Sequence, residues 1–206
     1  AAVFLAYATR VAILIFGDRS DRRRFGDCGD RAAAFVRAGD YDSVVQLGRS
    51  IMADAATSHY ALWGLEWAAF GAINARDEIE MRRLFGEALH RGAESHIPAQ
   101  LQAALGEHES AIGYWEVAVV QPGGEAAVPG LAYSLAVVGD SARAHRVIAR
   151  AYESSPTPEI IEWLVWSLLE QNEVNAAFEI VESGAVPDPS FWGLTVFQVA
   201  AMRAGR

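Results

Sequence analysis

The chain has 206 residues, of which 52% are hydrophobic and 21% are charged, a balance typical of a folded globular protein rather than a disordered one. Its formal net charge of −9 argues against nucleic acid or an anionic membrane as the main partner, because both need a cationic footprint. Cys28 is the only cysteine, so no internal disulfide bond or thiolate metal cluster can form, and we expect a reducing, cytoplasmic compartment.

All 17 basic side chains are arginine, which we interpret as codon bias in a GC-rich, bacterial genome. The chain begins without methionine, and its last residues, 202–206, resemble the approach to a further repeat turn. We therefore expect a piece of a longer protein.

Residues 1–16 are apolar apart from Thr9 and Arg10. We favour a helix or strand that packs on the end of a helical array and hides its apolar face. A truncated transmembrane helix is the alternative, with the arginines of residues 19–24 on its cytoplasmic flank, although such a helix needs about 20 apolar residues. A signal peptide is not favoured, because it would carry its positive charge before the apolar run, whereas the arginine cluster here follows that run. Residues 17–30 are rich in Gly, Asp and Arg, and this composition predicts an irregular linker.

A regular helical pattern starts near Arg31 and reaches a turn at residues 39–42, Gly-Asp-Tyr-Asp. Glycine ends a helix well because it adopts the left-handed conformation without a Cβ clash. Asp40 or Asp42 can then cap the next helix, which we expect to run through about Ala53.

Four further helix–turn–helix repeat units follow. The second has an aromatic-rich helix over 58–75, a turn at 76–78 and a partner helix over 79–90. The other units span residues 95–121, 125–155 and 157–184, and Pro98 and Pro129 fall in the first turns of their helices, where a missing N–H costs nothing. A final helix over 190–203 follows Pro187 and Pro189.

One short turn pattern recurs in register, at residues 106–111, 139–144 and 172–177. Each step is 33 residues, and helical apolar patterns stand before and after each copy. A fixed period in the low thirties, built as helix–turn–helix, is typical of a solenoid of repeats.

These residues resemble the tetratricopeptide repeat family over roughly residues 26–206. The turn at 39–42 matches. The small–large–small–proline pattern after the turns at 106, 139 and 172 is supplied by Ala111, Trp115, Ala118 and Pro122, by Ala144, Ile148, Ala151 and Pro156, and by Ala177, Val181, Gly184 and Pro189. The first unit departs from the pattern with Val44 and Gly48. The resemblance implies an all-α, right-handed α-solenoid of about five helix pairs plus a terminal helix, preceded by an apolar, Arg-rich segment over 1–25.

In that family, ligands usually lie along the concave surface made by the first helix of each pair. Helix geometry then suggests outward positions for nine candidate partner-binding residues: Trp63, Glu66, Phe70, His96, Gln100, Tyr133, Glu162, Trp166 and Glu170. Aromatic anchors beside carboxylates suit a protein segment with basic and apolar side chains. The competing interpretation is that Trp63, Phe70 and Trp166 simply belong to the core. The family members that clamp a chaperone's C-terminal carboxylate use Lys, Arg and Asn at these places, so that function is not expected here.

The sequence shows no constellation that specifies chemistry. It has no phosphate-binding loop, no dinucleotide-binding glycine motif and no His-Glu-x-x-His helix. His90 and Glu94 supply only two ligands where metal sites need three or four, and His108 between two glutamates favours a solvated turn. We therefore expect no enzyme, cofactor or metal, but a protein-interaction scaffold. The alternatives are self-association through the apolar ends, 1–16 and 190–202, or a regulatory segment of a larger enzyme or transcription regulator.

Overall fold

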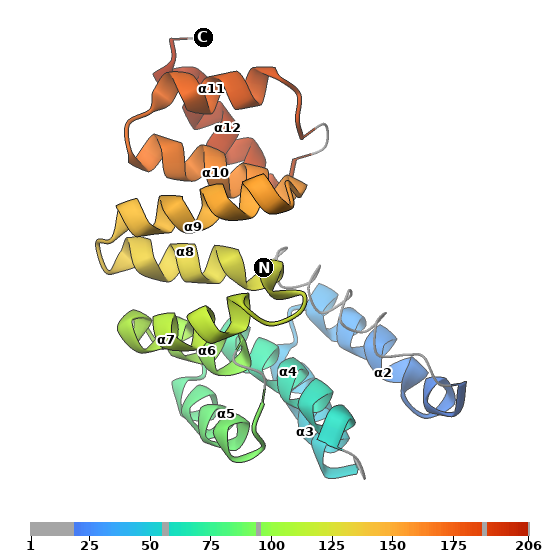
Figure 1. Cartoon of the computed structure of the whole chain (residues 1–206). Coiled ribbons are helices and arrows are strands. Elements are labelled where there is room, and N and C mark those ends of the chain that lie inside the picture. Colours follow the sequence, from blue (N-terminus) through green and yellow to red (C-terminus); the bar gives the residue numbers. More distant parts are fainter. Residues whose placement is uncertain (1–18, 55–57, 94–95, 187–188, 206) are drawn as a thin grey trace. The chain divides into compact units, whose positions relative to one another are not determined.

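The computed structural model describes residues 19–54, 58–93, 96–186 and 189–205, and every regular element in these ranges is a helix (Figure 1). The predicted all-α class is confirmed for this part of the chain. The apolar segment over 1–16, with the interpretations offered for it, lies outside the described residues. In chain order the helices are α2 (Arg19–Ala38), α3 (Tyr41–Asp54), α4 (Ser58–Ala75), α5 (Glu78–His90), α6 (His96–Ala104), α7 (His108–Val119), the short 3-10 helix η1 (Gly124–Ala127), α8 (Val128–Val137), α9 (Ser141–Ser154), α10 (Pro158–Glu170), α11 (Val174–Glu182) and α12 (Phe191–Arg203).

Helix α2 corrects the prediction of an irregular linker over 17–30, because residues 19–30 are helical. Its composition includes Asp and Arg residues three or four positions apart, as at Asp27 and Arg31, and this spacing supports a helix. The later part of α2 also packs against α3 and α4, where Ala32 is buried and Cys28 is partly buried. Tertiary packing thus outweighs the glycines that suggested a loop.

The predicted repeat turns share one backbone conformation. The residue that opens each turn has a positive φ, which is 71° at Gly39, 57° at Arg76, 80° at Gly106, 90° at Gly139 and 62° at Asn172. At four of these turns the structure shows the following amide bonded back to the preceding helix, as in Asp40 N to Phe35 O at 2.9 Å and Asp140 N to Leu135 O at 2.9 Å. This left-handed C-terminal motif ends each first helix, and it confirms the predicted turn positions.

Aspartates start several of the second helices. Asp40 accepts hydrogen bonds from the backbone N and the hydroxyl of Ser43, so it, of the two aspartates considered, caps α3. These bonds hold the pKa of the Asp40 carboxyl below its ordinary value, the side-chain bond from Ser43 being the larger cause. Asp77 and Asp140 cap α5 and α9 in the same way. The turns at Gly39, Arg76 and Gly139 therefore fix both the end of one helix and the beginning of the next.

The chain folds as two compact units, Ala1–Gly106 (unit 1) and Glu107–Arg206 (unit 2). In unit 1 the mostly buried helix α4 packs against α3, α5 and α6. A Cβ atom added to Gly48 of α3 would lie 2.5 Å from both the Gly64 carbonyl oxygen and the Ala68 amide nitrogen of α4. The backbones of α3 and α4 therefore meet directly. Gly48 stands where the later repeats carry a large residue, and its lack of a side chain permits this direct backbone contact.

In unit 2 the small–large–small pattern fills the core as predicted for its first two copies. Ala111, Trp115 and Ala118 are buried on α7, as are the corresponding Ala144, Ile148 and Ala151 on α9. The Trp115 ring lies directly on α8, where a Cβ at Gly130 would be 2.4 Å from it. In the last copy Ala177 is buried and Gly184 is exposed. The predicted terminal helix is confirmed as α12, which contacts α10 and α11.

Candidate functional site

The nine candidate residues divide between the two units, and each set is described within its own unit. Trp63, Glu66, Phe70, His96 and Gln100 belong to unit 1, whereas Tyr133, Glu162, Trp166 and Glu170 belong to unit 2. The described structure thus does not define one site that contains all nine.

Two of the aromatic candidates form part of the unit 1 core. Trp63 is 2% exposed and Phe70 is 5% exposed. Both rings lie edge-to-face against Trp67, with centroid separations of 6.3 Å and 6.1 Å. The prediction that these rings face outward is wrong, because α4 is apolar nearly all round and this side of it packs against α2 and α3. The competing interpretation, a packing role, describes them correctly.

Glu66 of α4 and His96 of α6 form a pair inside unit 1. The His96 Nε2 atom lies 3.1 Å from the Glu66 Oε1 atom, and the imidazole is almost completely buried. Gln100, one turn after His96, is partly exposed. A contact between a buried imidazole and a partly exposed carboxylate of this kind links two helices and orients the ring.

Glu162 of α10 also has a structural role. It is buried, and its carboxylate accepts hydrogen bonds from Ser190 N at 2.6 Å and from Ser190 Oγ at 2.5 Å. Ser190 in turn caps α12 by accepting from Gly193 N. Gly193 lies so close that a Cβ there would be 2.3 Å from the carboxylate. The prediction of Glu162 as an outward groove residue is therefore wrong, since the residue holds the start of α12.

The remaining candidates lie on neighbouring helices of unit 2. Tyr133 of α8 is 49% exposed, with Val137, 50% exposed, one turn further along. Trp166 of α10 is partly exposed and lies edge-to-face against Trp163 at 5.1 Å, and Glu170 follows it, exposed, one turn later. Tyr133 and Trp166 are 33 residues apart and hold equivalent repeat positions, as do Val137 and Glu170. We call these four residues the α8–α10 face.

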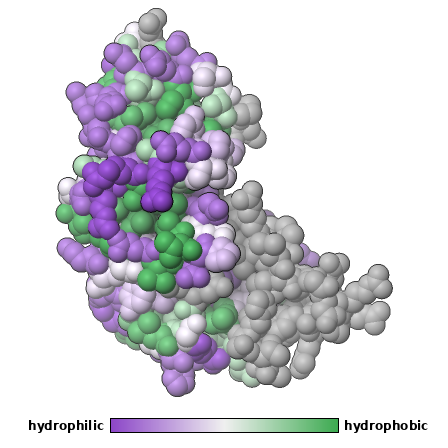
Figure 2. All heavy atoms as spheres, viewed as in Figure 1, coloured by the Kyte–Doolittle hydropathy of each residue, from purple (hydrophilic) through white to green (hydrophobic). Residues whose placement is uncertain are grey.

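Neighbouring side chains fix part of this face. His108, at the start of α7, packs edge-to-face on Tyr133 with 5.6 Å between ring centroids, and its Nδ1 atom lies 3.4 Å from the buried Ser134 hydroxyl. Further apolar side chains are exposed in the same unit, with Val117 near the end of α7, Val120 just after α7 and Val138 just after α8. Figure 2 shows hydrophobic side chains reaching the surface over α7 and α8 among hydrophilic ones. The face therefore combines a held aromatic ring with accessible apolar area.

Unit 2 is strongly acidic. Residues 107–206 contain 13 Asp and Glu residues but only five arginines, a formal charge of −8, whereas residues 1–106 contain 13 acidic residues and 12 arginines, a formal charge of −1. Almost the whole net charge of the chain thus belongs to the unit that carries the α8–α10 face. Such a field attracts cationic partners and speeds their association.

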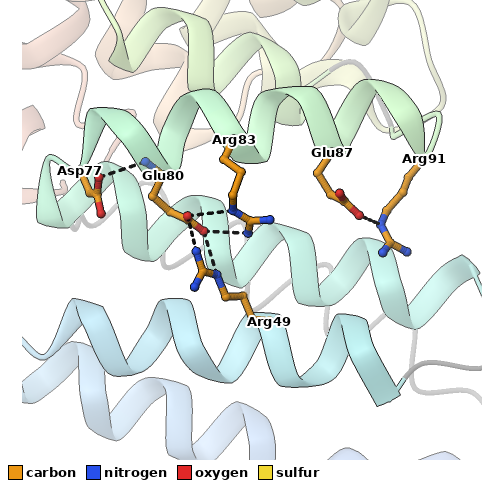
Figure 3. Close-up of polar contacts among 6 residues, drawn as sticks. All are labelled: Arg49, Asp77, Glu80, Arg83, Glu87 and Arg91. Carbon is orange, nitrogen blue, oxygen red and sulfur yellow. Dashed lines mark hydrogen bonds and ion pairs between the residues drawn. The ribbon is translucent and has the colours of Figure 1, made fainter.

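A second polar feature, which the sequence analysis missed, lies between α3 and α5 of unit 1. Arg49 of α3 and Arg83 of α5 both bind the carboxylate of Glu80, which is only 5% exposed (Figure 3). The Arg49 Nε atom lies 3.1 Å from Oε1, and the Arg83 Nε and Nη2 atoms lie 2.9 Å from Oε2 and Oε1. Arg49 Nη2 completes the set on Oε2. One buried carboxylate therefore binds two guanidinium groups in a bidentate manner.

These charges perturb one another. Burial alone would raise the pKa of the Glu80 carboxyl, but the hydrogen bonds from Arg83 and Arg49, together with their positive charges, hold that pKa below its ordinary value. The hydrogen bond to Glu80 raises the pKa of Arg83 in return. Glu80 and Arg83 are therefore both ionised at neutral pH.

Beside this cluster is a hollow of about 480 Å³, which we call the arginine groove. It is lined by Arg49, Met52 and Ala53 from the α3 side and by Arg83, Glu87 and Arg91 from the α5 side. Glu87 and Arg91 form a further ion pair (Figure 3). The Arg49 and Glu80 partners are 31 residues apart, so no local spacing predicts their meeting. The only signal was an Arg82-Arg83 pair, which is also typical of a solvated helix face.

Among the described residues, no group of three His, Cys, Asp or Glu side chains is placed to hold a metal ion. In the same part of the chain, no helix has the length and apolar content that a bilayer crossing requires. Comparison of the sequence with protein-family models and with curated protein sequences gives no match.

Proposed function

We propose that this chain is a tetratricopeptide-like, right-handed solenoid that acts as a non-catalytic protein-interaction scaffold. The support for the repeat architecture is the recurrence of a positive-φ, helix-ending residue at each predicted turn, with the following amide bonded back to the preceding helix at Asp40, Asp77, Asp140 and Glu173. Repeated helix pairs bury a continuous core and leave a rigid surface for binding.

The observation that carries the proposed function is the α8–α10 face. Tyr133 and Trp166 occupy the same repeat position on contacting helices, and both keep part of their rings accessible within an acidic unit. Aromatic side chains on rigid helices supply contact area at little conformational cost, and Glu170 adds a charge beside them. The partner that fits is a protein segment that carries both apolar and basic side chains.

The first experiment measures binding of a fluorescein-labelled amphipathic peptide, with leucines on one side and arginines on the other, by fluorescence anisotropy. Tyr133→Ala and Glu170→Arg should each weaken binding by roughly fivefold or more, since an exposed anchor or charge contributes about 1 kcal/mol or more. Glu182→Arg, an exposed charge reversal on α11 of the same unit, is the matched control.

The control decides the interpretation. If Glu182→Arg weakens binding as much as Glu170→Arg, the peptide responds only to the overall charge of unit 2 and the proposed face is refuted. If the three variants bind like the parent protein, the partner surface lies elsewhere. Circular dichroism on each variant separates lost binding from lost folding.

A second candidate function, self-association, is favoured by the exposed apolar side chains Leu194 and Met202 on α12. Paired terminal helices would cover them. Sedimentation equilibrium of the parent chain and of the Leu194→Glu, Met202→Glu double variant tests this candidate. A concentration-dependent dimer that the double variant abolishes would support it, and a monomer at high concentration would dismiss it.

A further inference from the structure

The arginine groove differs in sign from the rest of this acidic protein. Its wall contains three guanidinium groups, Arg49, Arg83 and Arg91, and one carboxylate, Glu87. The buried Glu80 carboxylate behind Arg49 and Arg83 is the nearest further charge that hydrogen-bonds to the wall. Together with Glu80, the described groups that line this groove or hydrogen-bond to its wall carry three positive and two negative formal charges, a net charge of +1.

The guanidinium groups are also held in place. Arg49 and Arg83 each use Nε and Nη2 to bind Glu80, which leaves three of the five N–H donors of each group for other acceptors. Their side chains are 39% and 46% exposed and line the groove. A ligand therefore meets donors whose side-chain ordering is already complete, which lowers the entropic cost of binding.

We propose that the arginine groove binds a carboxylate of an acidic peptide segment from a partner protein, with an adjacent apolar side chain resting on Met52 and Ala53. This site lies in unit 1, is independent of the α8–α10 face and attracts the opposite charge. Guanidinium groups match the planar carboxylate geometrically, and bonds between two ionised groups are about twice as strong as neutral ones.

The size of the charge imbalance selects the ligand class. One monovalent carboxylate neutralises the groove, whereas a phosphate carries a charge of about −1.5 to −2 at neutral pH and would leave an excess of negative charge. A nucleic acid would require many more phosphate contacts than one surplus charge can provide, on a unit whose own formal charge is −1. The groove volume of about 480 Å³ suits one or two peptide side chains.

The test uses the whole chain and a fluorescein-labelled peptide of alternating Glu and Leu, followed by anisotropy. A matched peptide with Gln in place of Glu gives the contribution of charge. Arg49→Gln should weaken binding of the Glu peptide at least about tenfold, because a charge-assisted contact is lost while Arg83 still neutralises Glu80. Arg37→Gln, an exposed arginine of the same unit outside the groove, should leave binding unchanged within about twofold, as distant surface charges are screened.

A variant that should bind the peptide more tightly provides the decisive test. Glu87→Gln removes one negative charge from the groove wall and leaves the three arginines, so it should tighten binding about threefold. A variant that merely damaged the fold would not bind more tightly. The proposal is overturned if the Gln peptide binds as well as the Glu peptide, if inorganic phosphate displaces the peptide better than acetate at equal ionic strength, or if neither the parent chain nor Glu87→Gln binds at millimolar concentration.

Discussion

The closest packing in unit 1 leads to a sharp stability prediction. Gly48 of α3 lies against the backbone of α4, where an added methyl group would stand 2.5 Å from two backbone atoms and 2.9 Å from the Ala68 Cβ. Gly48→Ala inserts that methyl group into the helix–helix contact. Because non-bonded carbon contacts are optimal near 3.5–4.0 Å, α3 and α4 would have to separate by about 1 Å.

Two effects oppose each other in this variant. Alanine favours a helix over glycine by about 1 kcal/mol, whereas forcing a methyl group into a packed core costs typically 1–3 kcal/mol and occasionally more. Here the obstructing atoms belong to the backbone, which cannot rotate away like a flexible side chain, so the upper part of that range applies. The helices must also loosen the adjacent contact at Gly64, whose added Cβ would stand 2.7 Å from the Gly48 carbonyl oxygen. We expect a net loss of about 2 kcal/mol.

Urea unfolding followed by circular dichroism, with matched alanine substitutions, measures this loss. Gly86 lies within α5, and an added Cβ there meets nothing within 4 Å, so Gly86→Ala carries the helix-propensity gain without the clash. It should stabilise the protein by about 0.5–1 kcal/mol. Equal stabilisation by Gly48→Ala and Gly86→Ala would refute the reasoning, because it would mean that α3 and α4 have room for a methyl group.

Three further outcomes are expected. The pKa of Glu80 is lowered in the folded protein, so its stabilising contribution is complete above the ordinary value of 4.5 and is lost as pH falls through the lower folded value. The Glu80→Gln variant should therefore be less stable than the parent protein at pH 7, and its stability should fall less steeply in acid. Urea unfolding at each pH measures both effects. Thr157→Ala removes the side-chain cap of α10 and should cost about 1 kcal/mol in the same assay. Gly193→Ala should displace the Glu162 carboxylate and loosen α12. Amide hydrogen exchange in α12 should then be faster in the variant than in the parent protein, while exchange in α8 stays the same; unchanged exchange in α12 would contradict the close contact.

The parts of the fold that the sequence predicts are those determined within a few neighbouring residues. A turn such as that at Gly139 is specified locally, because the glycine ends one helix and Asp140 caps the next. The buried Ala144 and Ile148 follow from the same short register. The linker prediction failed because the helical state of residues 19–30 is stabilised partly by packing of α2 on other helices, which local composition does not reveal.

The candidate site was harder to predict, because helical periodicity says which residues share a face but not what covers that face. Periodicity predicts outward positions for both Trp63 and Tyr133, yet the first is buried between helices and the second is half exposed. Glu162 was similarly assigned to a groove, and only the path of the chain brings Ser190 to its carboxylate. The meeting of Arg49 with Glu80 depends on how the helices pack, because the two residues are 31 positions apart in the sequence.

The basic side chains that line the arginine groove are all arginines, and this determines how binding of a ligand there can be regulated. Arginine stays protonated throughout the physiological pH range, and the lowered pKa of Glu80 keeps that carboxylate ionised as well. The chain contains no lysine, so acetylation of an ε-amine cannot neutralise the wall. A ligand held there would be insensitive to compartment acidity and to acyl-transfer signalling, and its release would depend on ionic strength, on competing acidic segments or on modification of the ligand itself.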